Sequence, residues 1–206
     1  MSDVLRKHLF DIPDGMIYLD GNSLGPLPRA VPARIASMLK DEWAQQLIKG
    51  WNASGWMEQP ARVGDRVAQL IGAPKGTTVM GDTLSIKVYQ AVAAALKLNP
   101  ERRVILSDTG NFPTDLYMVE GLIKTLDHGY ELRTVAPQDV ADAIDETVAC
   151  VLLTHVDYRT GRMHDMSDIT RRAQNKGAVM VWDLAHSAGA VPLDLAATGA
   201  EMAVGC

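Results

Sequence analysis

The stretch that decides the fold is VMVWDLAHSAGAVPLDL, residues 179–195. Its first four residues, Val179–Trp182, are large and apolar, which is typical of a parallel strand covered on both faces. Asp183 follows directly, and His186 comes one short step later. Burying an unpaired carboxylate costs on the order of several kcal/mol, so we expect a positive or hydrogen-bonding partner to meet Asp183.

Outward from this stretch, short apolar runs alternate with amphipathic segments. The strand candidates are Thr78–Met80, Val104–Ser107, Glu131–Val135, Ala149–His155, Val179–Trp182 and Met202–Gly205. The helix candidates are Arg29–Ile48, Ala61–Ile71, Leu84–Leu98, Thr114–Leu126, Pro137–Asp145 and Ser167–Lys176. This alternation predicts an α/β fold with a mostly parallel sheet and right-handed crossovers. We expect a helical segment over residues 1–60, packed on a sheet domain over residues 61–206.

The composition is that of an ordinary globular protein. The chain has 206 residues, of which 47% are hydrophobic and 22% charged. A net charge of −5 argues against nucleic acid or an anionic membrane as the main partner. The N-terminus lacks the apolar core of a signal peptide, and no apolar run is long enough to cross a bilayer. Cys150 and Cys206 match no metal or disulfide spacing, which favours free thiols in a reducing cytoplasm.

Polar residues follow several of the predicted strands. In open α/β sheets, ligands bind beyond the carboxyl ends of the strands, so these residues are expected to share one crevice. They are residues 81–85, 108–112, 154–157 and 183–186.

The sequence GDTLS, residues 81–85, leads directly into a predicted helix. Free backbone N–H groups of the first helical turn, with the hydroxyls of Thr83 and Ser85, predict a site for a phosphate-sized anion. The simpler alternative is that Asp82 or Thr83 caps the helix. Neither a GxGxxG nor a Walker loop occurs, which disfavours a dinucleotide.

The sequence NFPTDLY, residues 111–117, follows the next strand. Thr114 or Asp115 is expected to cap the helix that starts there. Phe112 is either ordinary core or a plate for a planar ring. A phosphate site, an aromatic plate and a carboxylate suit a flat, phosphorylated heterocycle, whose pyridine nitrogen Asp183 would keep protonated.

Two histidines beside this site allow other interpretations. His186 either hydrogen-bonds the ligand, orients Asp183, or simply lies satisfied at a helix start. A metal site made of His155, Asp157, His164 and His186 is a rival hypothesis, but the spacing lacks the close pairs typical of zinc helices. We therefore expect no metal.

Five motifs in order resemble bacterial kynureninase, a family of pyridoxal-phosphate (PLP) enzymes. They are YLDGNSLGPLP (18–28), WNASGW (51–56), NFPTDLYMVEGL (111–122), LLTHVDYRTGRMHDM (152–166) and WDLAHSAGAVPLDL (182–195). The resemblance runs from about Tyr18 to the C-terminus. It implies the three-layer, mostly parallel large domain of the type I, or aspartate aminotransferase, fold.

The resemblance also implies roles for single residues. Leu84 and Ser85 would hold the cofactor phosphate, Phe112 would stack on the pyridine ring, and Pro113, Thr114 and Asp115 would complete that cofactor-contacting segment. Thr154 would touch the cofactor, Asp183 would pair with the ring nitrogen, and His186 would support them. Trp51, Asn22 and Ser23 would face the substrate. Asp157 stands where relatives often carry an amide, which leaves its role open.

The implied activity is hydrolysis of L-kynurenine, or 3-hydroxykynurenine, to L-alanine and anthranilate or 3-hydroxyanthranilate. The implied setting is tryptophan catabolism and NAD biosynthesis, in a cytoplasmic homodimer. The family's Schiff-base lysine would lie beyond Cys206, as would its C-terminal small domain, and Lys87 matches no family lysine. The 206-residue chain alone is therefore expected to be inactive, and to aggregate or remain partly unfolded.

Three other functions stay open. One is another type I lyase, such as a cysteine desulfurase relative, which would not explain the FPTDLY motif. Another is a nicotinamide-dependent enzyme, disfavoured by the missing glycine fingerprint. The last is a non-catalytic chain that binds cofactor weakly or serves as a partner subunit.

Overall fold

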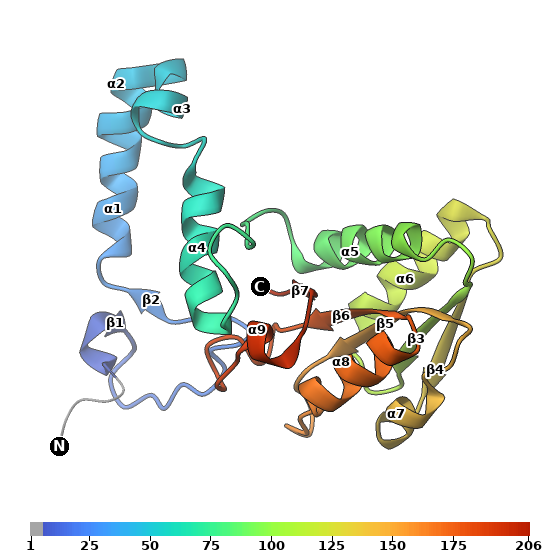
Figure 1. The fold of residues 1–206 in the computed structure, drawn as a ribbon. Helices are drawn as coiled ribbons and strands as arrows, with labels where there is room; N and C mark the ends of the chain where they lie inside the picture. Colours follow the sequence, from blue (N-terminus) through green and yellow to red (C-terminus); the bar gives the residue numbers. More distant parts are fainter. Residues whose placement is uncertain (1–5) are drawn as a thin grey trace. The chain divides into compact units, whose positions relative to one another are not determined.

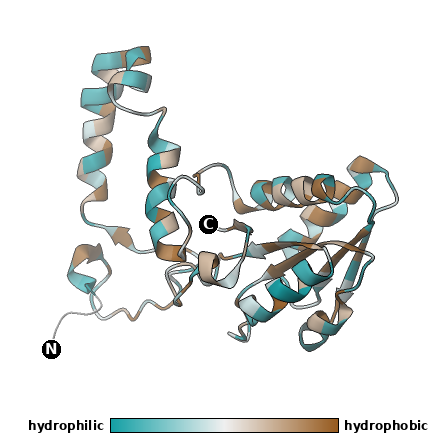
Figure 2. Ribbon diagram, in the orientation of Figure 1, coloured by the Kyte–Doolittle hydropathy of each residue, from teal (hydrophilic) through white to brown (hydrophobic). Residues whose placement is uncertain are grey.

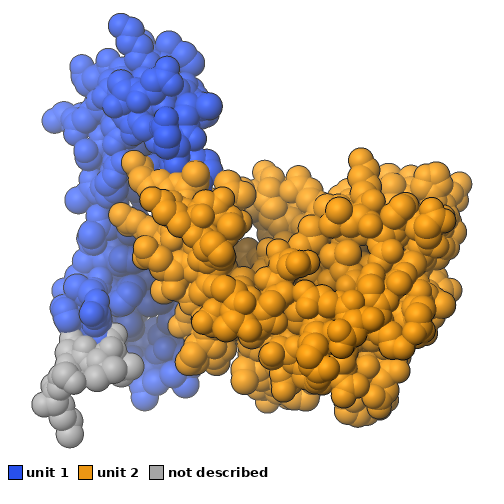
Figure 3. Space-filling model, in the orientation of Figure 1, with its two compact units in different colours: residues 1–60 blue, residues 61–206 orange. Residues whose placement is uncertain are grey.

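A computed structural model describes residues 6–206. The chain divides into two compact units, one over residues up to 60 and one over residues 61–206 (Figure 3). We call them unit 1 and unit 2 and describe each by itself. No helix among residues 6–206 is long and apolar enough to cross a membrane.

Unit 2 is built on a five-stranded parallel sheet (Figure 1). Its strands are β3 (Val104–Asp108), β4 (Glu131–Val135), β5 (Val148–Thr154), β6 (Val179–Asp183) and β7 (Met202–Val204), in the order β4-β3-β5-β6-β7. The predicted parallel sheet is confirmed. After β4 the chain crosses to the other side of β3, where it forms β5. Such a reversal of strand order opens a crevice between β3 and β5 at their carboxyl ends.

The inner strands β3, β5 and β6 are buried on both faces, which makes the unit three-layered. Successive strand residues alternate between two hydrophobic clusters: Leu106, Leu153 and Trp182 belong to one, and Leu152 and Val181 belong to the other. Two helices, α5 (Leu84–Leu98) and α6 (Pro113–Leu126), supply the second cluster, while α8 (Met166–Asn175) supplies the first. Figure 2 shows the strands as the most hydrophobic layer. The apolar runs of the sequence are therefore strands covered on both sides.

Three further helices complete the first cluster of unit 2. They are α4 (Gln59–Ile71), α7 (Val140–Ala143), which follows a 3₁₀ turn at Pro137–Asp139, and α9 (Leu195–Thr198). The predicted helix Pro137–Asp145 is therefore too long. Ile144 adopts an extended backbone and is buried in the core, which ends α7 one residue earlier.

The predicted strand Thr78–Met80 is wrong, because these residues pair with no strand among those that the structure describes. β-Propensity gives a strand only where a neighbour completes the ladder. The segment packs instead against α4, where Gly64 brings the two backbones together: a Cβ on Gly64 would lie 2.0 Å from the Thr78 carbonyl oxygen.

Unit 1 consists of a small antiparallel ribbon and a run of helical turns. The ribbon pairs β1 (Phe10–Asp11) with β2 (Leu27–Pro28), after a 3₁₀ turn at Lys7–Leu9. The helical turns are α1 (Val31–Ser37), a π-helical turn at Met38–Trp43, α2 (Ala44–Gln46), a 3₁₀ turn at Leu47–Lys49 and α3 (Gly50–Ala53). The predicted helix Arg29–Ile48 thus starts two residues later and breaks at Leu47, whose φ is 49°.

Candidate functional site

Asp183 lies at the carboxyl end of β6 and is fully buried. One carboxylate oxygen, Oδ1, accepts a hydrogen bond from the backbone N–H of Ala185 at 2.9 Å. The other, Oδ2, lies 3.1 Å from the hydroxyl of Thr154, the residue that pairs with Asp183 across β5 and β6. No ion pair formed by residues 6–206 includes Asp183. The partners of this carboxylate are therefore an amide and a hydroxyl rather than a cation.

A second buried carboxylate faces the same region. Asp115, in the first turn of α6, is fully buried, and neither of its oxygens has a hydrogen-bond partner. Burial, and then the charge of Asp183, raise the pKa of Asp115 to about 7. Burial also raises the pKa of Asp183, against the opposing effects of the Ala185 N–H, the Thr154 hydroxyl and His186. Two desolvated carboxylates this close together favour a cationic hydrogen-bond donor between or beside them.

Asn111 is linked to Asp183 through the Thr154 hydroxyl, and it lies beyond the end of β3. Its side chain is buried, its amide oxygen accepts from the Thr154 hydroxyl and from the Phe112 N–H, and its amide nitrogen donates to Ser107. Asn111 belongs to the polar segment 108–112 that was expected in the crevice, but the sequence predicted no role of its own for it. Its place three residues beyond the end of β3 was the available signal.

Three rings gather beside the strand ends. Phe112 is half-buried, and its ring meets the rings of Tyr158 and His186 edge-on, at centroid distances of 5.1 and 5.8 Å. The His186 Nδ1 lies 3.1 Å from the Val156 carbonyl, so this nitrogen carries the proton and donates. We call this cluster of the Phe112, Tyr158 and His186 rings the aromatic wall.

The helix behind Phe112 starts differently from the prediction. Pro113 opens α6 with Phe112 as its N-cap residue, and no side chain caps the first turn. The prediction that Thr114 or Asp115 caps the helix is therefore wrong. Asp115 points into the core instead, while Thr114 is half-buried.

The predicted phosphate loop precedes α5, which packs against β6 and β7 (Figure 1). Thr83 caps this helix by accepting the Ile86 N–H at 3.5 Å, which bears out the capping alternative. Leu84 packs on the core, and the half-buried Ser85 hydroxyl takes part in no hydrogen bond among residues 6–206. Lys87 lies over Gly81 and pairs with Asp82 at 3.1 Å. The loop thus offers a free hydroxyl and free N–H groups.

The four residues of the rival metal hypothesis do not converge. His164 Nε2 binds Asp108 Oδ2 at 2.7 Å, and Arg162 joins this pair. Burial alone would raise the pKa of Asp157, but the N–H groups of Thr160 and Arg159 hold it below its usual range, so Asp157 caps a turn.

His155 lies edge-on to Trp182, and its Nδ1 is buried without a partner. Burial, and then the nearby His164, lower the pKa of His155, so the ring is neutral. No group of three metal-ligating side chains exists among the described residues.

The predicted substrate contacts Trp51, Asn22 and Ser23 all lie in unit 1. Trp51 is half exposed and meets Trp56 edge-on at 6.1 Å. Asn22 is exposed, and the Ser23 hydroxyl donates to Asp20 at 2.7 Å. Their role toward a substrate stays a prediction.

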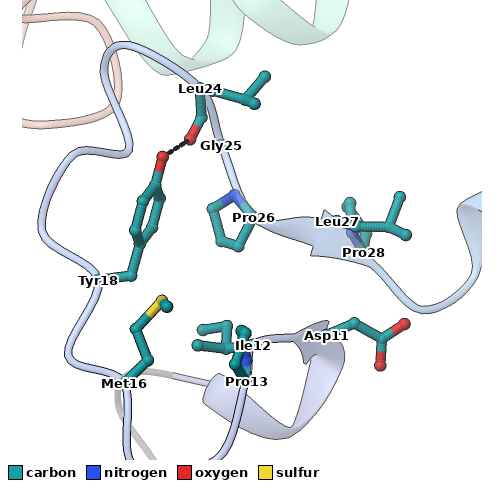
Figure 4. A pocket seen from close by; sticks show the side chains of 10 residues that line it. All are labelled: Asp11, Ile12, Pro13, Met16, Tyr18, Leu24, Gly25, Pro26, Leu27 and Pro28. Carbon is teal, nitrogen blue, oxygen red and sulfur yellow. Dashed lines mark hydrogen bonds between the residues drawn. The ribbon is translucent and has the colours of Figure 1, made fainter.

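Unit 1 also holds a pocket of about 510 Å³ (Figure 4). Mostly apolar side chains line it, among them Met16, Pro26 and Leu27, and the Tyr18 hydroxyl donates to the Leu24 carbonyl at 2.6 Å. Asp11 is its one charged side chain. The pocket therefore lacks the convergent polar groups found at the strand ends of unit 2.

Comparison with known proteins assigns the fold to a family. Residues 17–205 match the family model described as aminotransferase class-V. The chain belongs to the aminotransferase class-V family. Similar solved structures include C-DES with glycine covalently linked to its PLP cofactor (TM-score 0.79, 16% identity, 97% of this chain and 54% of that one).

Another is the cysteine desulfurase CsdA of Escherichia coli, with a TM-score of 0.77 and 18% identity over 97% of this chain and 52% of that one. These likenesses confirm the predicted type I architecture of this class-V chain.

Curated relatives of this class-V chain include kynureninases. Those of Burkholderia pseudomallei (strain 1106a) and Pseudomonas fluorescens are 52% and 50% identical to it over 205 residues. Each match covers 97% of this chain and 49% of the relative. The chain therefore spans about half the length of the curated relatives it matches.

Proposed function

We propose that this chain is the cofactor-binding part of a PLP-dependent kynureninase, which cleaves L-kynurenine hydrolytically to anthranilate and L-alanine. The names of its relatives at about 50% identity support the substrate. The observation that carries the proposal is the buried pair Asp183 and Asp115, which no cation among residues 6–206 neutralises.

The residues present fit PLP. A protonated pyridine nitrogen is the cationic donor that the two carboxylates lack. The Ser85 hydroxyl and the first-turn N–H groups of α5 would hold the phosphate. Phe112 offers a ring face or edge beside the same strand ends, and Thr154 borders Asp183. When bound, PLP supplies a ring that withdraws electrons from the bonds around the substrate Cα.

Each residue of the chain then has a physical task. Asp183 holds the proton on the ring nitrogen, and the Ala185 N–H and Thr154 hydroxyl fix the direction of its carboxylate. Burial and Asp183 raise the pKa of Asp115 to about 7, and a cationic ring beside it would favour its ionised form, which would add a second negative charge. The aromatic wall of Phe112, Tyr158 and His186 keeps water from one side of the site.

We further propose that residues 6–206 alone do not turn over kynurenine. Such chemistry needs a lysine amine that binds the cofactor and moves protons. In unit 2, Lys87 is paired with Asp82 and Gln90. The other unit 2 lysines are exposed on the outer surface; they are Lys75, Lys97, Lys124 and Lys176.

A homodimer in a reducing cytoplasm completes the proposal. Two observations support it. Cys150 and Cys206 are free thiols, and burial raises the pKa of Cys150 to about 12, which makes it inert toward oxidation. Unit 1 exposes large apolar side chains, among them Leu19 and Ile48, which a second copy would cover.

The test uses the full-length protein loaded with PLP and measures anthranilate release by fluorescence. We expect turnover of L-kynurenine, and a loss of about a hundredfold or more in kcat/KM for Asp183→Ala. Asp127→Asn, at the exposed end of α6, is the matched control and should keep normal activity. Sulfur release from L-cysteine without anthranilate release would instead establish the desulfurase alternative, which the structural neighbours favour on fold alone.

A further inference from the structure

A chain of buried polar groups runs from β3 to the site. The Ser107 hydroxyl donates to the Leu152 carbonyl at 2.7 Å, and the Asn111 amide nitrogen donates to Ser107 Oγ at 2.9 Å. The Asn111 amide oxygen accepts the Phe112 N–H at 2.7 Å. Because a backbone N–H can only donate, it fixes which end of the Asn111 amide is oxygen.

The Thr154 hydroxyl lies between two acceptors. One is the Asn111 amide oxygen, with which it makes a short contact, and the other is Asp183 Oδ2 at 3.1 Å. A hydroxyl has one proton and donates it to one acceptor at a time. Asn111 and Asp183 therefore compete for the same proton.

We propose that Asn111 is a positioning residue that acts on Asp183 through the Thr154 hydroxyl. This rests on the proposed function. When Asp183 is ionised, the hydroxyl turns to the carboxylate. When Asp183 is protonated, it donates to Thr154, and Thr154 donates to Asn111. By accepting the hydroxyl proton, Asn111 leaves Asp183 a stronger base, and so a firmer holder of the ring-nitrogen proton.

Other titratable groups also face Asp183. They are Asp115 from α6, His186 beyond β6 and Cys206 beyond β7. Asn111 differs from them because it is neutral and reaches the carboxylate only through Thr154. Its effect can therefore be separated from theirs by substitution at residue 111.

Two substitutions should shift the pH midpoint at which Asp183 takes up a proton, in opposite directions. Asn111→Asp adds a negative charge and holds the Thr154 proton, so the pH midpoint of Asp183 should rise by about one unit. Asn111→Ala removes the competing acceptor, so the hydroxyl turns fully to Asp183 and the midpoint should fall by about half a unit. A purely structural role for Asn111 would move both variants in the same direction or move neither.

The experiment titrates the full-length apoprotein with PLP between about pH 5 and pH 9. PLP affinity should fall on the acid side as Asp183 and the neighbouring Asp115 take up protons, and the midpoint of that fall is compared between variants that all retain Asp115. Protonation changes of PLP itself are common to all variants and cancel. The ¹⁵N NMR shift of ring-labelled PLP in each loaded variant gives an independent measure of the ring-nitrogen proton.

Two controls separate coupling from loss of stability. Ser107→Ala removes the far end of the chain, so it should lower the melting temperature and leave the midpoint unchanged. In a Thr154→Val background, Asn111→Ala should produce no further shift, because the connecting hydroxyl is gone.

Midpoints that shift in the same direction, or not at all, in proteins that still bind PLP would overturn this inference and leave the proposed function intact. A wild-type protein that binds no PLP at any pH would overturn the proposed function itself.

Discussion

At the scale of single residues, the site is defined by two buried carboxylates that form no ion pair among residues 6–206. Asp183 and Asp115 are both fully buried, and the carboxylate oxygens of Asp115 have no hydrogen-bond partner among residues 6–206. Native proteins rarely bury two carboxylates without a cation, because desolvation and mutual repulsion both oppose it. Where they do, a functional site is the expected reason.

This charge makes the apoprotein sensitive to pH. The pKa of Asp115 rises from an ordinary 3.8 to about 7 in the folded protein, so between these values the folded state binds more protons than the unfolded state. Stability is therefore greatest below about pH 4 for this group and is lost as the pH rises toward 7. We expect the ionised Asp115 to lower the free energy of unfolding by roughly a few kcal/mol at pH 8.

The measurement is chemical denaturation of the full-length apoprotein at pH 5 and pH 8. Asp115→Asn should be more stable than wild type at pH 8. In this variant the free energy of unfolding should differ less between pH 5 and pH 8 than it does in the wild type. Asp127→Asn, on the exposed end of the same helix, should leave that difference unchanged. A larger pH dependence in Asp115→Asn would contradict the assignment.

The sequence predicted some of these residues better than others. Asp183 could be predicted because it directly follows a buried apolar run, and the capping alternative at Thr83 is confirmed. The resemblance implied that Asp115 contacts the cofactor, but its inward turn could not be predicted from the local pattern, because a carboxylate in the first turn of a helix normally caps or faces solvent. The bonds of Asn111 depend on the spacing of β3 and β5, which no local pattern encodes.

At the scale of elements, close approach of two backbones shapes the start of unit 2. A Cβ at Gly64 of α4 would overlap the Thr78 carbonyl. We expect Gly64→Ala to destabilise the full-length protein by about 1–3 kcal/mol, because the helix must move away from residues 78–79.

The matched control for that change is Gly121→Ala. Gly121 also lies inside a helix, α6, but a Cβ there would meet nothing within 4 Å. This change should raise stability by up to about 1 kcal/mol, because alanine favours the helix. Urea unfolding curves would measure both. Equal effects of the two substitutions would refute the close approach.

The same elements show what periodicity can and cannot predict. Leu84–Leu98 and Glu131–Val135 form as predicted, because a helical period and a short segment of strand-forming residues are local signals. Thr78–Met80 carries an equally good strand signal but finds no neighbour among the described residues. The π-helical turn at Met38–Trp43 keeps the apolar spacing of a helix, so the pattern could not reveal it.

At the scale of the whole molecule, exposed apolar surface dominates the behaviour of the 206-residue chain. Ile17, Leu19 and Ile48 of unit 1 are each more than three-quarters exposed. In unit 2, β7 pairs with β6 alone among the described strands, which leaves an open edge. Such surfaces associate in water.

We therefore expect the isolated chain to self-associate, with a mass above 22.3 kDa in light scattering that grows with concentration. A variant carrying Leu19→Glu and Ile48→Glu should associate less, because charge opposes burial of these surfaces. A soluble monomer with one cooperative, concentration-independent melting transition would contradict the expectation.

The most direct measurement is a crystal structure of the full-length protein with PLP bound. We expect a carboxylate oxygen of Asp183 to lie about 2.7–3.0 Å from the pyridine nitrogen, with Asp115 next to the same pair. A loaded protein in which Asp183 lies beyond hydrogen-bonding distance of that nitrogen would contradict the central claim.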